Sequence, residues 1–205
     1  MTLYDLKPRF QALLRPLTGW LYARGVTANM VTLAAAGGSM LLGLALLVWS
    51  HAHPGLFLLV PLWLLARMAL NAIDGMLARE HGQKSSLGAY LNEVSDVVSD
   101  AALFLPFAYV APFSAPIVVV VVLLAVVSEM AGALGPMVGA SRRYAGPLGK
   151  SDRALLFGAL GLWVGLAGGS LPGWTMPIMT LAAVLLLVTI VNRVRRGVAE
   201  AAAMR

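Results

Sequence analysis

Long apolar runs, each close to the length of a membrane-spanning helix, restrict the folds open to this chain. A helix needs roughly 20 apolar residues to cross the hydrocarbon core of a bilayer. Of the 205 residues, 60% are hydrophobic and 12% are charged, and the mean hydropathy is +0.83. Soluble domains do not have such a composition. The sequence therefore predicts an all-α integral membrane protein.

We expect six transmembrane helices in a single domain. The predicted spans cover residues 27–50, 56–77, 87–110, 117–140, 154–168 and 176–192. Residues 1–26 form an N-terminal arm, residues 27–192 a six-helix bundle and residues 193–205 a basic cytoplasmic tail. The two halves show no inverted or repeated similarity, which weighs against a small secondary transporter as a third class.

The N-terminal arm has the pattern of an interfacial helix. Residues 3–24 place leucine and phenylalanine at helical spacing, with polar residues elsewhere around the wheel. This pattern predicts an amphipathic helix that lies on an anionic membrane surface. We expect Pro8 and Pro16 to interrupt a continuous helix. The alternative is a solvated basic arm.

Basic residues gather on one side of the predicted topology. The chain has 15 lysines and arginines against 9 acidic residues, a net charge of +6. All of these basic residues except Arg67 lie in the arm, in residues 79–84, in residues 141–153 or in the tail. Basic residues favour cytoplasmic links, so we expect an inner-membrane protein with both termini and the polar residues 71–100 on the cytoplasmic side. Topology explains the basic excess, so no nucleic-acid partner is predicted.

A polar stretch at residues 71–100 interrupts the apolar background. At about 100° per residue, its side chains fall on one side of each of two consecutive helices. The second span contributes Arg67, Asn71, Asp74, Gly75 and Ala78, and the third contributes Gly88, Asn92, Ser95, Asp96, Ser99 and Asp100. The short link between these spans predicts antiparallel neighbours whose polar sides face each other at the cytoplasmic end.

Two explanations fit this polar pair of helices. Carboxylates that face each other repel unless a cation lies between them, and oxygen ligands suit Mg²⁺, Mn²⁺ or Ca²⁺. Small residues beside the carboxylates leave room for a bulky ligand. The alternative is a polar helix contact in which Arg67 pairs with an aspartate. An ionised residue costs about 2.5–3.5 kcal/mol at the bilayer centre, so each of these charges needs a partner, a metal ion or water. Pairing with Arg67 accounts for one carboxylate and leaves the clustering of the others unexplained.

The stretch from Asn71 to Asp96 reads N-x2-D-G-x2-A-R-x8-G-x3-N-x3-D. This pattern resembles the signature of the CDP-alcohol phosphotransferases, membrane enzymes of phospholipid synthesis. Residues 25–32 also resemble the entry of that family into its first span. The resemblance covers essentially the whole chain and implies six helices with a cytoplasmic interfacial helix. The usual signature has four aspartates, so Asn71 and Asn92 are departures from it.

The resemblance implies a transferase reaction. A substituted phosphoryl (phosphatidyl) group would pass from a CDP-linked lipid, CDP-diacylglycerol, to a small alcohol or phosphorylated polyol, and CMP would leave. One or two Mg²⁺ or Mn²⁺ ions would be held at Asn71, Asp74, Asn92 and Asp96, with Asp96 also the catalytic base. The cytidine diphosphate would be lined by Gly75, Ala78, Arg79 and Gly88, with Arg79 at a phosphate. Dimers occur in this family, so a homodimer is also implied.

The two asparagines leave the activity open. Their carbonyl oxygens coordinate metals more weakly than carboxylates and cannot act as bases. Asp100, one turn beyond Asp96, is expected to restore one charge as a further metal ligand, and Arg67 to favour an anionic substrate. The alternatives are a working enzyme with one tight and one weak ion, an enzyme with altered metal preference, or a nucleotide-lipid binder without turnover.

Basic residues between the fourth and fifth spans form a second candidate site. We predict that Lys150, with Arg142 or Arg143, binds a phosphate of the acceptor or of the lipid donor. A topology signal is the alternative explanation for these charges. Glu129 is isolated in its apolar span, where it is either a pocket residue or a packing residue paired with a neighbouring donor.

Overall fold

The computed structural model describes residues 3–204. This part of the chain forms seven α-helices and four short 3-10 helices, and it contains no strand. The α-helices are α1 (Leu3–Ala23), α2 (Ala28–Trp49), α3 (Leu59–Glu80), α4 (Ser86–Phe104), α5 (Ala115–Ala133), α6 (Lys150–Leu166) and α7 (Pro177–Ala203). The 3-10 helices are η1 (Pro54–Leu58), η2 (Leu105–Tyr109), η3 (Gly135–Val138) and η4 (Gly173–Thr175).

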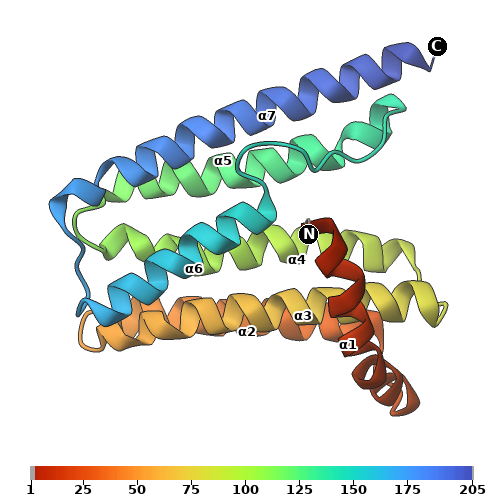
Figure 1. Cartoon of the computed structure of the whole chain (residues 1–205), viewed down its shortest axis with the longest axis horizontal. Helices are drawn as coiled ribbons and strands as arrows, with labels where there is room; N and C mark the ends of the chain where they lie inside the picture. The colour runs from red at the N-terminus through yellow and green to blue at the C-terminus, as the bar shows by residue number, and fades with distance from the viewer. Residues whose placement is uncertain (1–2, 205) are drawn as a thin grey trace.

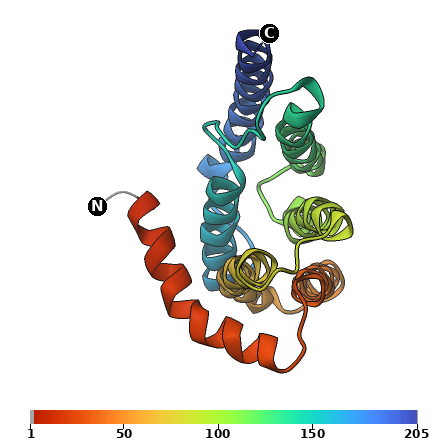
Figure 2. The same ribbon diagram turned by 90° about the vertical axis from the view of Figure 1, so that its right-hand side faces the viewer.

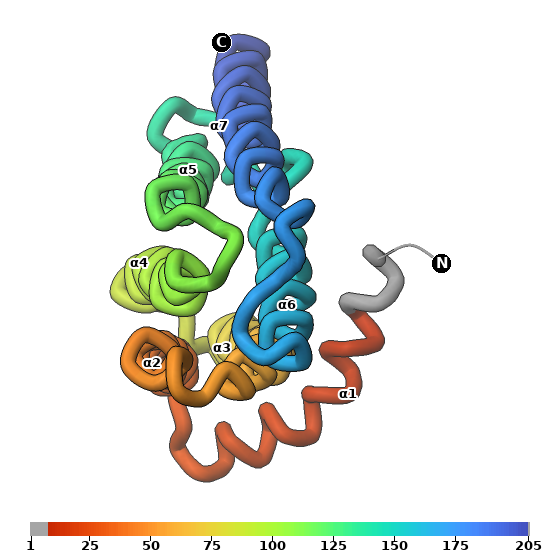
Figure 3. The backbone as a smooth tube through the Cα atoms, turned by 90° about the vertical axis from the view of Figure 1, so that its left-hand side faces the viewer, coloured from red at the N-terminus to blue at the C-terminus, as the bar shows by residue number. Residues whose placement is uncertain are grey.

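Helices α2 to α7 run alongside one another as a bundle (Figure 1). Viewed end on, α2 and α3 form one side, α5 and α7 the other, and α4 and α6 lie between them (Figures 2 and 3). The backbone of α4 packs closely on α2, while α3 packs on α2 and α6. α3 and α4 are antiparallel, as predicted, but their closest backbone partners are other helices. Side chains therefore bridge the space between α3 and α4.

Four segments are long and apolar enough to cross a membrane: Ala28–Trp49, Pro54–Glu80, Ala115–Ala133 and Gly173–Ala203. They correspond to four of the six predicted spans. α4 falls short because it carries Glu93, Asp96 and Asp100, and α6 because it has only 17 residues. Both nevertheless lie within the bundle beside the four apolar segments (Figure 1). The structure is that of a membrane protein, and the count of six spans stays a prediction.

The N-terminal arm is one curved helix that lies crosswise at the end of the bundle where α3 joins α4 (Figures 1 and 2). The expected interruption is wrong, because α1 contains both Pro8 and Pro16. Contacts with the end of α3 hold the helix: Arg15 bonds both carboxylate oxygens of Glu80 at 3.0 Å. Tyr22 also stacks on His81. Tertiary contacts thus outweigh the cost of proline in a helix. Its place in the membrane interface stays a prediction.

Several predicted helix ends lie elsewhere. Pro106 and Pro136 fall in η2 and η3, so α4 and α5 end at Phe104 and Ala133, before the predicted limits. Proline lacks the N–H that would continue the α-helical hydrogen bonds. In contrast, α7 continues to Ala203. Most of the predicted tail is therefore helical.

Glycines allow α2 to approach its neighbours closely. A Cβ atom at Gly43 would lie 2.3 Å from the carbonyl oxygen of Ala102 on α4. At Gly38 it would lie 2.3 Å from the ring of Trp63 on α3, whose indole N–H donates to the hydroxyl of Ser39. Gly37, next to Gly38 on the same helix, has no such neighbour within 4 Å. These contacts fix α2 against both helices of the polar stretch.

Aromatic side chains fill the end of the bundle away from α1. Phe104 stacks on Phe157 with ring centroids 3.9 Å apart, and Phe107 meets Phe157 edge to face. All three rings are fully buried. Phe104 lies only one turn beyond Asp100 on α4, so the apolar core begins where the polar residues end.

Candidate active site

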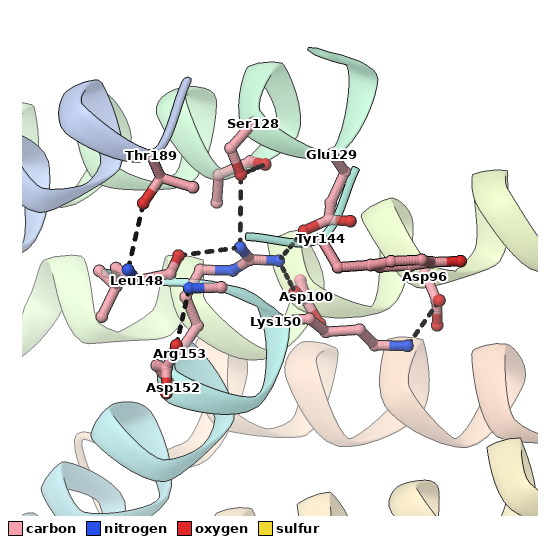
Figure 4. A network of polar contacts seen from close by, with 12 residues as sticks. Asp96, Asp100, Ser128, Glu129, Tyr144, Leu148, Lys150, Asp152, Arg153 and Thr189 are labelled. Atoms are coloured by element: carbon pink, nitrogen blue, oxygen red, sulfur yellow. Dashed lines mark hydrogen bonds and ion pairs between the residues drawn. The ribbon is translucent and has the colours of Figure 1, made fainter. Parts of the chain in front are cut away.

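Polar side chains from α3, α4 and α6 meet at Asp96. The Nζ atom of Lys150 lies 2.5 Å from Oδ2 of Asp96 (Figure 4). Arg67 Nη2 lies 3.2 Å from Oδ1 of the same carboxylate, and the Asn71 amide donates to that oxygen at 3.3 Å. Arg67 also donates to the backbone carbonyl of Asp96 at 3.0 Å. The predicted base is therefore held by two cations and an amide.

Asp100 lies between two arginines. Its Oδ1 atom is 2.5 Å from Nη1 of Arg67, and its Oδ2 atom is 3.0 Å from Nη2 of Arg153. All three residues are buried. Asp100 was expected to act as a metal ligand, but both of its oxygens bond guanidinium groups. The alternative explanation of the polar helices expected Arg67 to pair with an aspartate. In the structure Arg67 pairs with two, Asp96 and Asp100.

A second buried cluster lies beside the first and joins α5, α6 and α7 (Figure 4). Glu129 Oε1 lies 2.9 Å from Arg153 and 3.4 Å from Arg193. Arg153 also donates to the Ser128 hydroxyl at 3.3 Å, and Arg193 to the Ser128 carbonyl at 2.5 Å. Glu129 was expected to be either a pocket residue or a packing residue paired with a neighbouring donor. In the structure it is paired with donors from neighbouring helices. Such pairing is what a buried charge requires.

Arg153 and Arg193 were not recognised as site residues from the sequence. They were assigned to a polar loop and to the tail, yet they are 0% and 2% exposed. Helical periodicity contains the missing signal. Arg153 precedes the buried positions Phe157, Leu160 and Val164 on one face of α6, and Arg193 follows Leu186 and Thr189 on one face of α7. If the buried face of each helix is continued by one turn into the charged residues beside it, Arg153 and Arg193 fall on the inward side.

Asp74 is the carboxylate of this site that has no cationic partner among residues 8–204, whose side chains the structure describes. It is buried, and its Oδ2 atom accepts a hydrogen bond from the Thr32 hydroxyl on α2 at 2.9 Å. A buried carboxylate favours a nearby positive charge. Asp74 is thus the position where an added cation would be most favourable.

The other residues of the signature lie on α3 and α4, the helices of Asp74 and Asp96. The guanidinium of Arg79 folds back over Gly75, where a Cβ atom would lie 3.0 Å from it. At Gly88, a Cβ atom would lie 2.8 Å from Oδ1 of Asn29. Ala78 and Asn92 are half-buried on α3 and α4. The two glycines therefore permit close approach of polar side chains to both helices.

The three predicted phosphate-binding residues separate in the structure. Lys150 begins α6 and reaches Asp96, as described. Arg142 pairs with Glu93 on α4 and lies 4.0 Å from Oε2 of Glu129. Arg143 instead pairs with Glu200 near the end of α7. The structure thus brings Lys150 to the signature residues, places Arg142 beside them and directs Arg143 elsewhere.

The donor set suits a single divalent ion of the Mg²⁺ or Mn²⁺ type. Among the described side chains of residues 8–204, no group of three or more His, Cys, Asp or Glu is placed to hold a metal. Two carboxylates, Asp74 and Asp96, would offset the charge of one ion, and the amide oxygens of Asn71 and Asn92 would add neutral ligands. A second ion lacks carboxylates, because Asp100 bonds two arginines.

Apolar helices that surround carboxylates, amides and basic groups at one end of a bundle define an integral membrane protein with a buried polar site. The chain belongs to the CDP-alcohol phosphatidyltransferase family, whose model matches residues 25–200. The family expected from the signature is confirmed. Membership supports CDP-alcohol phosphatidyl transfer as the class of reaction.

Curated relatives cover most of the chain. The inner membrane protein YnbA of Escherichia coli K12 is 50% identical over 198 residues, which are 95% of this chain and 96% of that protein. The phosphatidylinositol phosphate synthase of Mycobacteroides abscessus is 28% identical over 189 residues, which are 90% of this chain and 83% of that enzyme.

Solved structures share the fold. The phosphatidylinositol phosphate synthase PgsA1 of Mycobacterium tuberculosis with CDP-DAG bound superposes with a TM-score of 0.72 at 21% identity, over 89% of this chain and 92% of that chain. Its complex with manganese and citrate gives 0.70 at 21% identity, over 89% and 87%. At this level of identity, the likeness shows the fold alone.

Proposed function

We propose that the protein transfers a phosphatidyl group from a CDP-linked lipid, of the CDP-diacylglycerol type, to a small alcohol and releases CMP. The observation that carries this proposal is the meeting of the signature residues of α3 and α4 in one polar site. Asn71 bonds Asp96 at 3.3 Å across the space between the two helices. The family and the CDP-DAG bound to PgsA1 support the donor.

Asp96 acts as the base in this proposal. Arg67 and Asn71 hold its Oδ1 atom, so the carboxylate orientation is fixed while Oδ2 faces the half-buried Lys150. Oδ2 accepts the proton of the acceptor hydroxyl, whose oxygen forms a bond to the lipid-linked phosphorus. The bond from that phosphorus to the bridging oxygen breaks, and the oxygen leaves with CMP. Positioned carboxylates commonly take such a role in proton transfer.

One Mg²⁺ or Mn²⁺ ion would be held by Asp74 and Asp96 with the amide oxygens of Asn71 and Asn92. When bound, the ion neutralises charge on the diphosphate. Lys150 would then exchange Asp96 for a phosphate oxygen of the donor. The manganese bound to PgsA1 supports the type of ion. Arg67 and Asp100 serve to orient Asp96.

The donor nucleotide would lie along α3 and the start of α4. Gly75, Ala78 and Gly88 would line the cytidine diphosphate, and Arg79 would bind a phosphate. An apolar groove of about 350 Å³, lined by Leu42, Leu59, Leu62, Trp63 and Ala66, lies on α2 and α3. One of its lining residues, Ala66, directly precedes Arg67 in the sequence. The volume of the groove is typical of a ligand site. We propose that this groove takes part of an acyl chain.

We place the site and both termini on the cytoplasmic side of the inner membrane. α1 and the end of α7 lie at the bundle end where α3 joins α4 (Figure 1). The basic residues outside the apolar spans support this orientation, and the name of YnbA supports the membrane. Arg142 and Arg143 would face the headgroup region there. The homodimer implied by the resemblance stays a prediction.

A protein that binds a nucleotide lipid without turnover is the second candidate. It is favoured by the amides at positions 71 and 92 and by the bond between Lys150 and Asp96. The discriminating experiment incubates purified protein with CDP-diacylglycerol, Mg²⁺ or Mn²⁺ and a panel of glycerol phosphate, inositol phosphate, serine and simple polyols. We expect CMP release with at least one acceptor that stops when EDTA is added. Donor binding without any CMP release would leave only the binding function.

A further inference from the structure

Two fully buried arginines lie beside the proposed active site and take no part in the proposed chemistry. Arg153 and Arg193 are 0% and 2% exposed. Arg153 bonds Asp100, and Arg67 bonds both Asp100 and Asp96, so Arg153 is connected to the proposed base through Asp100 and Arg67. Buried guanidinium groups near a phosphate-transfer site are good candidates for binding a phosphorylated substrate. Whether they do so depends on what already binds them.

Carboxylates of the chain already neutralise these arginines. Three buried guanidinium groups, those of Arg67, Arg153 and Arg193, meet three carboxylates, those of Asp96, Asp100 and Glu129. Glu129 is central because it contacts both Arg153 and Arg193. An entering phosphate would have to displace a buried carboxylate or leave excess negative charge in the interior, and both are costly.

The cavity beside Arg153 is also too small for a phosphate. A cavity lined by Asp100, Glu129 and Arg153 measures only about 10 Å³. Such a volume is about that needed for one water molecule. The two terminal nitrogens of Arg193 also donate to the carbonyl oxygens of Ser128 and Tyr144. Within this cluster, only the Nε atoms of Arg153 and Arg193 are buried without a hydrogen-bond partner among the described residues. The ion pairs and the small volume of the cavity therefore leave no space for a phosphate beside Arg153.

The basic side chains nearer the surface are paired as well. Arg142 bonds Glu93, and Arg143 bonds Glu200. Lys150 bonds Asp96, and we have assigned it to the donor diphosphate. Among the described residues of the segment 142–153, each basic side chain thus has a carboxylate partner.

We infer that the acceptor is a small alcohol without a phosphate group, and that Glu129 determines this preference by neutralising Arg153 and Arg193. This inference rests on the proposed phosphatidyl transfer. The hydroxyl of such an acceptor needs only Asp96 and hydrogen-bonding partners. A phosphorylated acceptor would need a further cation, one that is neither neutralised by a buried carboxylate nor assigned to the donor, as Arg79 and Lys150 are.

The test compares acceptors that differ only in the phosphate: glycerol against glycerol 3-phosphate, and inositol against inositol 1-phosphate. With wild-type protein, CDP-diacylglycerol and Mg²⁺ or Mn²⁺, we expect kcat/KM for CMP release to be at least about tenfold higher for the unphosphorylated member. A preference for the phosphorylated members would overturn the inference and leave the transferase proposal standing.

Binding of glycerol 3-phosphate, measured by calorimetry, gives a readout that does not require turnover. Wild-type protein should show no binding at millimolar concentration, and E129Q should bind at least about tenfold more tightly than wild type because one carboxylate no longer competes. The control E200Q removes the same charge from the partner of Arg143, and it should behave as wild type. Submillimolar binding by wild-type protein would overturn the inference even if E129Q failed to fold or no CMP were released.

Discussion

The two oxygens of the Asp96 carboxylate lie in different surroundings. Oδ1 is held by buried Arg67 and by Asn71, whereas Oδ2 bonds Lys150, whose side chain is 35% exposed. A buried arginine contact is hard to break, while a partly exposed lysine can exchange partners at low cost. The geometry thus separates a fixed oxygen from one that is available for a proton or a metal ion.

Replacing Lys150 tests this separation because the lysine competes with the metal for Asp96 and binds the donor. We expect K150Q to bind Mn²⁺ more tightly and to raise KM for the CDP-linked donor, each by about tenfold. Electron paramagnetic resonance measures free Mn²⁺, and CMP release gives KM. K84Q, on the exposed link between α3 and α4, is the matched control. Unchanged Mn²⁺ affinity in K150Q would show that Lys150 does not compete with the ion.

The two amides test the ligand assignment. Restoring aspartate in N71D and N92D adds a negative charge at each position, and carboxylates bind Mn²⁺ more strongly than amides. Each variant should bind Mn²⁺ about tenfold more tightly, and the double variant more tightly still. Titration calorimetry measures the affinity without any need for turnover. Affinities equal to wild type would place the metal elsewhere.

At the scale of the helices, local sequence patterns predicted which residues share a helix, but they did not predict contacts between segments far apart in the chain. The signature spacing correctly assigned Asn71 and Asp74 to one helix and Asp96 to the next, because helical periodicity is local. The buried faces of α6 and α7 place Arg153 and Arg193 inward, but local patterns do not reveal their carboxylate partners, which come from other helices. For the same reason, the continuous α1 was missed: its contact with Glu80 joins residues far apart in sequence.

The close approach of α2 to α4 should depend on Gly43. In G43A the new methyl would lie 2.3 Å from the Ala102 carbonyl, so the helices must separate. We expect a loss of about 1–3 kcal/mol in the free energy of unfolding. In G37A, where no atom of another helix lies within 4 Å of the new methyl, stability should be unchanged or slightly higher. Thermal unfolding in detergent compares the two, and equal melting temperatures would contradict the tight contact.

At the scale of the whole molecule, the charges and the bundle suggest one orientation. The basic arm, the link between α3 and α4 and the end of α7 gather at one end (Figure 1). The opposite links at residues 50–53 and 167–172 contain no lysine or arginine. The positive-inside rule therefore puts the polar site on the cytoplasmic side.

Cysteine labelling can test this orientation because the chain has no cysteine. In S85C and A203C, a membrane-impermeant maleimide should react only after the inner membrane is opened. In H53C and G173C, at the opposite end, it should react in intact spheroplasts. The reverse pattern would put the site on the outer side and contradict the proposed topology.

The central claim is that Asp96, held between α3 and α4, takes the proton from an acceptor alcohol during phosphatidyl transfer. The most direct measurement is CMP release from CDP-diacylglycerol by wild-type protein and D96N, with Mg²⁺ or Mn²⁺ present and donor binding measured on the same samples. We predict that D96N lowers kcat by at least about a hundredfold but still binds the donor, while Y90F, on the exposed side of α4, keeps full activity. Wild-type kcat in D96N would contradict the claim.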